Sequence, residues 1–430
     1  MQSLSRRIRC AAMGLLSSKL TRNIGWLTGA ELLSRLGRIA TAVILARTLD
    51  ATAFGIAALA LTVFELMRIF TENGIGAAVV RASDDDLDAT TNTAYKIMWI
   101  ICSLLAGLQF FTGLGLTYLF PTAPTGWMVC ALAGVFLIMP FGLMHAYVLQ
   151  RAENMKQLSI VGSSQTIADH LLTALFALTG LGAWAIVLPK LLTSPIWLLG
   201  VRRGTPWQRN RSAGYKPARG LLQFSVPVLL SEIAVAAREQ CDKLLVSVTF
   251  GIEALGLYYF AFNAGLGLST ALNRAFNFAL YPLLCAIKTD DPTKIARYRG
   301  IVLLAAPGMS LVYGLQAFAA LFYVPFIFGP DWLHAAPLVA LICLSGPARG
   351  LLDSTRIYWR ATGNTVRELN SSLCFACGVL APFALFSAWG LTAAIVGSTT
   401  GATLTAVALA YPTLFPKRNH PMLPVQGATT

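Results

Sequence analysis

The stretch YKIMWIICSLLAGLQFFTGLGLTYLF, residues 95–120, indicates the class of protein to which this chain belongs. Apart from Lys96 it carries no charge, and a spanning helix needs about 20 apolar residues. Its apolar residues are continuous, which favours a helix over a barrel strand, because barrel strands alternate in polarity and need only about 10 residues. The stretch therefore predicts a transmembrane helix.

The composition extends this interpretation to the whole chain. Of the 430 residues, 56% are hydrophobic and only 12% are charged, about half the charged fraction of a soluble domain. Further runs of this kind can be bounded by turns and charges. The full set of predicted spans is 23–46, 53–74, 95–120, 126–149, 157–180, 183–201, 220–248, 254–286, 300–328, 333–355, 365–387 and 389–412. The predicted fold is an all-α polytopic membrane protein with twelve transmembrane helices.

The net charge of +14 could suggest a nucleic-acid partner, because basic domains neutralise phosphates. Its placement argues otherwise. Of the 33 Lys and Arg residues, 24 lie at the N-terminus, in the loops that follow even-numbered predicted helices, or in the C-terminal tail. Arg47 alone lies in a loop that follows an odd-numbered helix, on the other side of the membrane. By the positive-inside rule this bias predicts that both termini are cytoplasmic. The basic excess thus reports topology, and no nucleic-acid partner is expected.

An internal repeat divides the predicted helices into two halves. An offset of 201 aligns Glu31 with Glu232 and Gly55 with Gly256. Since each half has six helices, the two lobes are expected to have the same orientation in the membrane. They would be related by a pseudo-two-fold axis along the membrane normal, with a central cavity between them. The predicted parts are a basic cytoplasmic segment 1–22, an N-lobe 23–201, a basic linker 202–219, a C-lobe 220–412 and a cytoplasmic tail 413–430.

Charged and amide side chains within the spans are the candidate functional residues, because a charge in hydrocarbon costs several kcal/mol unless it faces water or a partner. Arginine suits the paired oxygens of a phosphate, amides suit sugar hydroxyls, and an unpaired acid can bind H⁺ or Na⁺. The substrate-binding candidates are Arg35, Arg38, Arg68, Lys190, Arg274, Arg349, Asn273, Asn277 and Gln165. The ion-coupling candidates are Glu31, Glu65, Asp169, Glu232 and Glu239.

Structural pairing is the alternative for several of these residues. The pairs with suitable spacing along one helix are Glu31–Arg35, Glu65–Arg68 and Glu239–Lys243. Lys190 and Arg274 have no acid within four residues on their own helices, which favours a ligand role for both. Arg349 and Lys243 have a further alternative, which is to snorkel to an interface.

Two other motifs have spacings that could hold a metal. Asp84-Asp85-Asp86-Leu87-Asp88 resembles a magnesium–diphosphate cluster, but such enzymes need a second cluster, for which Asp290-Asp291 is a poor candidate. We interpret the acidic run as a solvated loop. Cys374 and Cys377 have metal-like spacing but lie mid-helix without a second pair, which favours packing. No metal or other cofactor is expected.

Short motifs along the chain resemble a known family. They are Leu45-Ala46-Arg47-Thr48-Leu49 with Phe54-Gly55, Asn73-Gly74-Ile75-Gly76, Asp242-Lys243-Leu244-Leu245, Tyr281-Pro282, Gly329-Pro330-Asp331-Trp332 and Ala361-Thr362-Gly363-Asn364. In this order, and with twelve spans, they resemble bacterial polysaccharide flippases of the Wzx type, in the multidrug/oligosaccharidyl-lipid/polysaccharide exporter superfamily.

The resemblance implies a transporter rather than an enzyme. Its expected activity is to translocate undecaprenyl-diphosphate-linked oligosaccharide from the cytoplasmic to the periplasmic leaflet of the bacterial inner membrane by alternating access. The product would feed exopolysaccharide, capsule or O-antigen synthesis, with a polymerase and co-polymerase as further partners. Two alternatives stay open: a cation-coupled drug or metabolite antiporter of the same superfamily, and a membrane prenyl- or glycosyltransferase using Asp84–Asp88.

Overall fold

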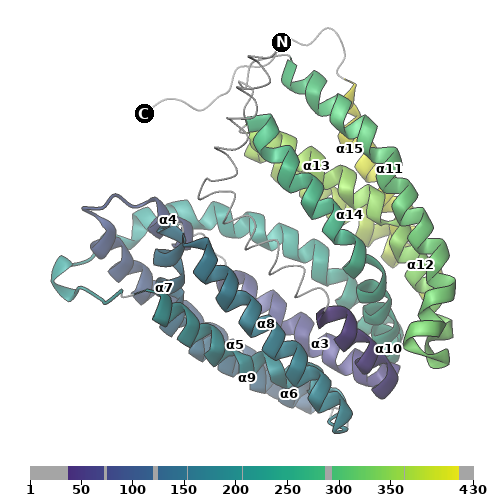
Figure 1. Cartoon of the computed structure of the whole chain (residues 1–430), viewed down its shortest axis with the longest axis horizontal. Helices are drawn as coiled ribbons and strands as arrows, with labels where there is room; N and C mark the ends of the chain where they lie inside the picture. Colours follow the sequence, from purple (N-terminus) through teal and green to yellow (C-terminus); the bar gives the residue numbers. More distant parts are fainter. Residues whose placement is uncertain are drawn as a thin grey trace, which may run out of the picture. The chain divides into compact units, whose positions relative to one another are not determined.

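The computed structural model describes residues 37–71, 75–119, 124–152, 154–205, 207–285, 293–362 and 364–415. Within these ranges every regular element is helical and there is no strand (Figure 1). Each predicted span coincides with helix over its described part. The predicted all-α class is therefore confirmed.

In the first half of the sequence the helices follow one another from residue 37 to the end of α9. After a helix at 37–48 come α3 (Ala51–Arg68), η1 (Ile69–Thr71), α4 (Ile75–Arg81), α5 (Leu87–Leu119), α6 (Thr125–Ile138), α7 (Pro140–Arg151), α8 (Met155–Leu178) and α9 (Trp184–Gly204). The turn before α3 is closed by Asp50, whose Oδ1 accepts a hydrogen bond from the Ala53 amide at 2.8 Å. Such an N-cap satisfies a backbone donor that the helix itself leaves free.

The second half follows the short turn η2 (Arg211–Ala213). Its elements are α10 (Ala218–Cys285), α11 (Thr293–Tyr323), the π-helical turn η3 (Val324–Phe328), η4 (Pro330–Ala335), α12 (Ala336–Leu344), α13 (Gly346–Ala361), α14 (Thr365–Phe386), η5 (Ser387–Trp389) and α15 (Leu391–Leu414). At Gly251 the backbone leaves the helical region, with φ 84° and ψ −177°. A positive φ of this kind favours glycine, so α10 is two helices that meet between the predicted spans 220–248 and 254–286.

The chain is a multi-pass membrane protein. Eight helices in the described residues are long and apolar enough to cross a membrane, or nine if the pair α6 and α7 is one span bent by 53°. One apolar window, Glu239–Leu266, runs across the break at Gly251, so it is the junction of two helices rather than a straight span. Twelve helices fit these elements, and their number stays a prediction.

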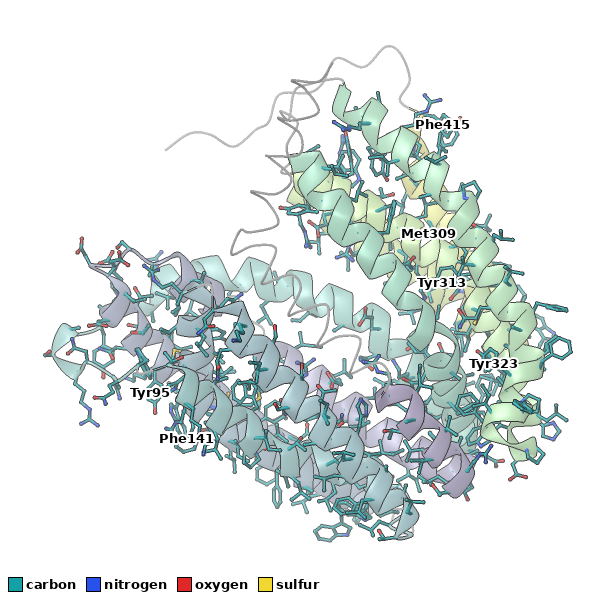
Figure 2. The ribbon with its side chains drawn as sticks, viewed as in Figure 1. Tyr95, Phe141, Met309, Tyr313, Tyr323 and Phe415 are labelled. Carbon is teal, nitrogen blue, oxygen red and sulfur yellow. The ribbon has the colours of Figure 1, made fainter. Side chains whose placement is uncertain are left out.

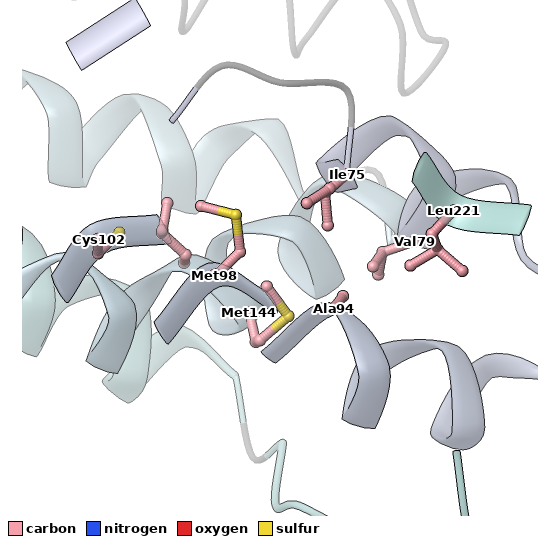
Figure 3. Packing of buried hydrophobic residues seen from close by; sticks show 8 residues of the cluster. Ile75, Val79, Ala94, Met98, Cys102, Met144 and Leu221 are labelled. Atoms are coloured by element: carbon pink, nitrogen blue, oxygen red, sulfur yellow. The ribbon is translucent and has the colours of Figure 1, made fainter. Parts of the chain in front are cut away.

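The contacts divide the chain into two compact units. The first contains the described residues up to Ala236 together with Gly251–Tyr259 and Ile327–Gly329. In it α5 packs on α6, α8 on α9, and α4 on α7. One buried cluster joins α4, α5, α7 and the start of α10 (Figure 3); it consists of Ile75, Val79, Ala94, Met98, Cys102, Leu143, Met144 and Leu221.

The second unit contains Ala237–Phe250, Phe260–Phe326 and the described residues from Pro330 onward. Here α14 packs on α15, α11 on α12, and α13 on both α14 and α15. Fully buried Tyr298 on α11 hydrogen-bonds through its hydroxyl to Thr355 Oγ1 on α13, at 3.1 Å. Phe260 and Trp332 stack with ring centroids 3.9 Å apart.

A reciprocal glycine contact joins the two halves of the sequence within the first unit. A Cβ on Gly55 would lie 1.8 Å from the carbonyl oxygen of Ile252, and a Cβ on Gly256 would lie 1.7 Å from that of Ala51. Real Cβ atoms do not approach this closely, so both positions require glycine. Both contacts obey the offset of 201, and this is the local geometry that a two-fold relation between the repeats produces.

A second repeat appears at the turns that follow α7 and α13. Asn154 Oδ1 accepts from the Gln157 amide, and its own amide donates to Leu149 O. Asn364 does the same with the Arg367 amide and Trp359 O. An offset of 210 relates the two sets, so the turns α7–α8 and α13–α14 are alike although their sequences differ.

The basic segment between α9 and α10 is attached to the first unit through α5. Asn92 Nδ2 donates to the carbonyl oxygens of Asn210 and Gly214 at 2.7 and 3.0 Å, and Thr93 Oγ1 donates to that of Lys216 at 2.9 Å. The ring of Tyr95 lies 5.2 Å from the Arg209 guanidinium (Figure 2). This segment is therefore held by side chains of the first unit.

The acidic run before α5 is exposed or half-buried, in keeping with its interpretation as a solvated loop, and it also helps to hold this segment. Asp86 pairs with Lys216 at 2.6 Å, Asp84 pairs with Arg151 at 2.6 Å, and Asp88 accepts from Asn210 Nδ2 at 2.8 Å. The hydrogen bonds from Lys216 and Ser83 lower the pKa of Asp86. Each of these three carboxylates thus has a protein partner.

We predict that Gly256→Ala destabilises the protein, because its methyl group collides with the Ala51 carbonyl. Overpacking of this kind costs about 1–3 kcal/mol, and thermal unfolding in detergent would show a lower Tm. Gly300→Ala is the matched control, since nothing lies within 4 Å of a Cβ at that helical position. Equal Tm values for the two variants would contradict the contact.

A second prediction concerns Asp86. Because the pKa of Asp86 is lowered, its bond to Lys216 contributes fully to stability at pH values above the ordinary pKa of an aspartate. This contribution is lost as the pH falls through the lowered pKa of Asp86. Asp86→Asn mimics that loss at neutral pH, so trypsin should cleave after Arg211 several-fold faster. Asp85→Asn, at an exposed neighbouring carboxylate, should leave the cleavage rate unchanged. Identical rates in the two variants would show that Asp86 does not hold the segment.

Candidate functional site

A charge pair lies inside the first unit between α8 and α9. Lys190 Nζ and Asp169 Oδ2 are 2.6 Å apart, with 41% of the lysine side chain and 10% of the aspartate side chain exposed. The expectation that Lys190 has no acidic partner is therefore wrong. Its partner is on the neighbouring helix, where spacing along α9 cannot reveal it.

Asp169 is the more buried member of the pair and keeps one oxygen without a hydrogen bond. The helix 37–48 packs beside it: Thr41 Oγ1 lies 3.4 Å from the carbonyl oxygen of His170, and a Cβ on Gly37 would meet the His170 ring at 3.0 Å. The free oxygen of a buried carboxylate can accept a further hydrogen bond or coordinate a small cation. The geometry therefore suits an ion-binding position.

A second pair, on α3, is structural. Arg68 Nε donates to Glu65 Oε2 at 2.8 Å, and 41% and 38% of the two side chains are exposed. This confirms the alternative that these residues pair along their own helix. Such half-exposed pairs contribute little to stability.

The second unit contains two cations against one aromatic ring. Lys243 Nζ lies 5.0 Å from the centroid of the Phe262 ring, and the Arg349 guanidinium carbon lies 5.6 Å from it. Lys243 is buried, so it does not snorkel. Besides the ring, its ammonium contacts the Glu239 carbonyl oxygen, Gln240 Oε1 at 3.1 Å and Asp242 Oδ1 at 3.7 Å.

Arg349, which is half-buried, differs from Lys190 and Lys243 in its partners. Its Nε donates to Ser345 Oγ at 3.4 Å, and no carboxylate within the described residues pairs with it. The two terminal nitrogens of the guanidinium are thus left for a ligand. A planar guanidinium with both terminal groups free matches the paired oxygens of a phosphate.

Amide groups lie on the helix that faces this turn of α13. Asn273 is buried, its Nδ2 donates to the Gly346 carbonyl oxygen at 3.4 Å, and its Oδ1 has no hydrogen-bond partner. Asn277, one turn further along α10, likewise has a buried Oδ1 without a partner. Pro347 opens α13 here, because it has no amide hydrogen to donate. The free amide oxygens are suited to accept hydrogen bonds from hydroxyl groups.

The remaining candidates are placed as follows. Arg38 and Glu239 are exposed and Gln165 is half-buried. Glu31 and Arg35 lie outside the described residues, as do the side chains of Glu232 and Arg274. Among the described candidates the structure pairs Lys190 with Asp169 and Glu65 with Arg68; the substrate and coupling roles of all of them stay predictions.

Sequence reasoning missed Phe262 and Ser345. Phe262 is an ordinary apolar residue by composition, and only its position between Lys243 and Arg349 distinguishes it. Ser345 precedes Arg349 by four residues, and this helical spacing is the signal that could have found it.

The fold is that of a class of membrane transporters. An inward-facing multidrug resistance MATE family transporter of the MOP superfamily matches with a TM-score of 0.67 at 13% identity, covering 88% of this chain and 93% of that one. The lipid II flippase MurJ, in an inward closed conformation, matches with a TM-score of 0.68 at 12% identity, covering 90% and 86%.

The chain belongs to the polysaccharide biosynthesis protein family, whose model matches residues 44–337. Succinoglycan biosynthesis transport protein ExoT of Rhizobium meliloti (strain 1021) is 23% identical over 76% of this chain and 66% of its own length. Lipopolysaccharide biosynthesis protein WzxC of Escherichia coli (strain K12) is 21% identical over 72% and 63%. The chain thus spans slightly less than two thirds of these relatives. The family resemblance seen in the motifs is confirmed.

We predict that the Asp169–Lys190 pair is energetically coupled. Lys190→Gln leaves a buried carboxylate without its cation, so it should lower the Tm more than the double variant Asp169→Asn/Lys190→Gln does. A double-mutant cycle should give a coupling of about 0.5–3 kcal/mol. Arg203→Gln, at an exposed position of the same helix, is the control. Additive effects of the two substitutions would mean that the pair is not coupled.

Proposed function

We propose that this protein is a flippase that translocates undecaprenyl-diphosphate-linked oligosaccharide repeat units from the cytoplasmic to the periplasmic leaflet. The transported units would feed the synthesis of a surface polysaccharide. Alternating access would move the substrate, in a bacterial inner membrane, with both termini in the cytoplasm. In addition to inner-membrane lipids, a polysaccharide polymerase and a co-polymerase would be its partners.

The single observation that carries this proposal is Arg349. It is an in-span cation with its terminal nitrogens free, held against the Phe262 ring that Lys243 also approaches. Asn273 and Asn277, whose amide oxygens have no partner, lie further along α10, the helix that carries Phe262. A ligand for such a group is an anion that also bears hydroxyls, and a sugar diphosphate fits that description. Relatives named for succinoglycan transport and for lipopolysaccharide biosynthesis support the same substrate class.

Ion coupling is the second part of the proposal. Asp169 would take up H⁺ or Na⁺ as its bond to Lys190 breaks, because a buried carboxylate must stay neutralised in a low dielectric. The other candidate acids, Glu31, Glu65, Glu232 and Glu239, stay predictions of the same kind. Glu65 is the weakest of them, since it is bonded to Arg68.

The two alternatives make different demands on the structure. A prenyl- or glycosyltransferase would need Asp84–Asp88 free to hold a metal, whereas Asp84 and Asp86 are bonded to Arg151 and Lys216. The MATE-like fold keeps a drug or metabolite antiporter as the second candidate. A deletion strain that gains drug sensitivity with unchanged surface polysaccharide would establish that candidate instead.

We predict that Arg349→Ala lowers export about tenfold or more at normal protein level, since it removes an in-span arginine whose two terminal nitrogens are free. A charged hydrogen bond of about 1.5–3 kcal/mol gives an effect of this size. The measurement is surface polysaccharide in a complemented deletion strain, together with accumulation of the lipid-linked intermediate.

Two further variants complete this experiment. Arg349→Lys keeps the charge but loses the fork, so it should restore export only in part. Arg203→Ala should export normally. Wild-type export from Arg349→Ala would overturn the assignment of Arg349 to the substrate.

A further inference from the structure

A crevice of about 200 Å³ lies in the second unit among α10, α11, α13 and α15. One face of α11 lines it, formed by Val302, Ala305, Ala306, Met309 and Ser310, whose spacing of three and four residues puts them on one side of the helix. Met309 and Tyr313 lie one turn apart on this helix (Figure 2). Thr403 and Val407 of α15 line it as well. The crevice is therefore narrow, apolar and bordered by small side chains.

The mouth of this crevice opens on an exposed apolar surface of the second unit. Ser310, Thr403 and Val407 line the crevice and are themselves exposed. Beside them Leu311 is 63% exposed and Leu404 is 72% exposed. Large apolar side chains that are exposed on a membrane-spanning helix face hydrocarbon. An occupant can thus enter sideways from the bilayer.

One arginine stands at one end of the crevice. Arg299 precedes Val302 by three residues, a rise of about 4.5 Å along the helix, so it lies on the face of α11 that lines the crevice. It is exposed and has no carboxylate partner among the described residues. Arg299 lies over the Phe415 ring, with 4.9 Å between the guanidinium carbon and the ring centroid. This end is the one predicted to be cytoplasmic.

We propose that this crevice binds the polyprenyl chain of the substrate's lipid carrier, with Arg299 at the charged end of the chain. The inference rests on the proposed function and adds the position of the lipid part. The small side chains leave room for the methyl branches of an isoprenoid, and the flexible thioether of Met309 adapts to them. Arg299, without an acidic partner among the described residues, gives this end of the crevice the positive charge that an anionic carrier requires.

The test is photo-crosslinking of the full-length protein in nanodiscs. The probe is a polyprenyl diphosphate with a diazirine in its first isoprene units. We expect adducts on α11 between Val302 and Ser310 or on α15 at Thr403 and Val407. Unlabelled polyprenyl diphosphate should suppress them, whereas an equal amount of phosphatidylglycerol should not.

Variants fill the crevice or remove the charge at its end. Ala306→Phe and Ser310→Phe should each reduce labelling at least about fivefold, as should Arg299→Gln. Leu304→Phe is the matched control, because its side chain is 84% exposed on the same helix and does not line the crevice. Labelling that is equal in the filled variants and in Leu304→Phe would overturn the proposal. Equal suppression by phosphatidylglycerol would also overturn it, since the crevice would then take any anionic lipid.

A transport assay in proteoliposomes keeps this result separate from the proposed function. Translocation of lipid-linked oligosaccharide without labelling of the crevice would refute the crevice site and leave the flippase proposal standing. Loss of both would refute the flippase proposal, and the crevice site would fall with it. Labelling in the wild type, lost in the filled variants, supports the site.

Discussion

A charge inside the bilayer is costly unless it meets a partner or water, and this constraint explains the pairs that charged side chains form within the described helices. Asp169 and Lys190 neutralise each other between α8 and α9, and Glu65 and Arg68 do so along α3. Lys243 is surrounded by a carbonyl, an amide, a carboxylate and a ring. Against this background the incomplete coordination of Arg349 is an exception that stability alone does not explain.

The class of fold was predictable because its cause is local. Continuous apolar runs form helices in a bilayer, where each backbone group must be bonded within its own segment. For the same reason a break between two predicted spans was found close to its true place, at Gly251. The repeat was visible in the sequence where Glu31 aligns with Glu232 and Gly55 with Gly256. The turns at Asn154 and Asn364 make equivalent hydrogen bonds but follow a different offset, so the alignment did not find them.

The candidate site was predictable in its residue types and not in its pairings. Spacing along a helix found Glu65–Arg68, but it could not find Asp169 for Lys190, because that contact depends on how α8 and α9 pack. The same limit applies to the acidic run, whose partners Arg151 and Lys216 are distant in sequence. The position of Phe262 in the sequence did not indicate its contacts with Lys243 and Arg349, because aromatic residues are common in apolar helices.

The contact between Gly55 and Gly256 has a consequence for how this chain can change over time. Each glycine is fitted to a carbonyl that the other half of the sequence supplies. A gain of even one carbon at either position is felt by both halves, and no neighbouring side chain can be trimmed to make room, because the obstacle is main chain. At this point each half of the sequence is held to glycine by the main chain of the other half.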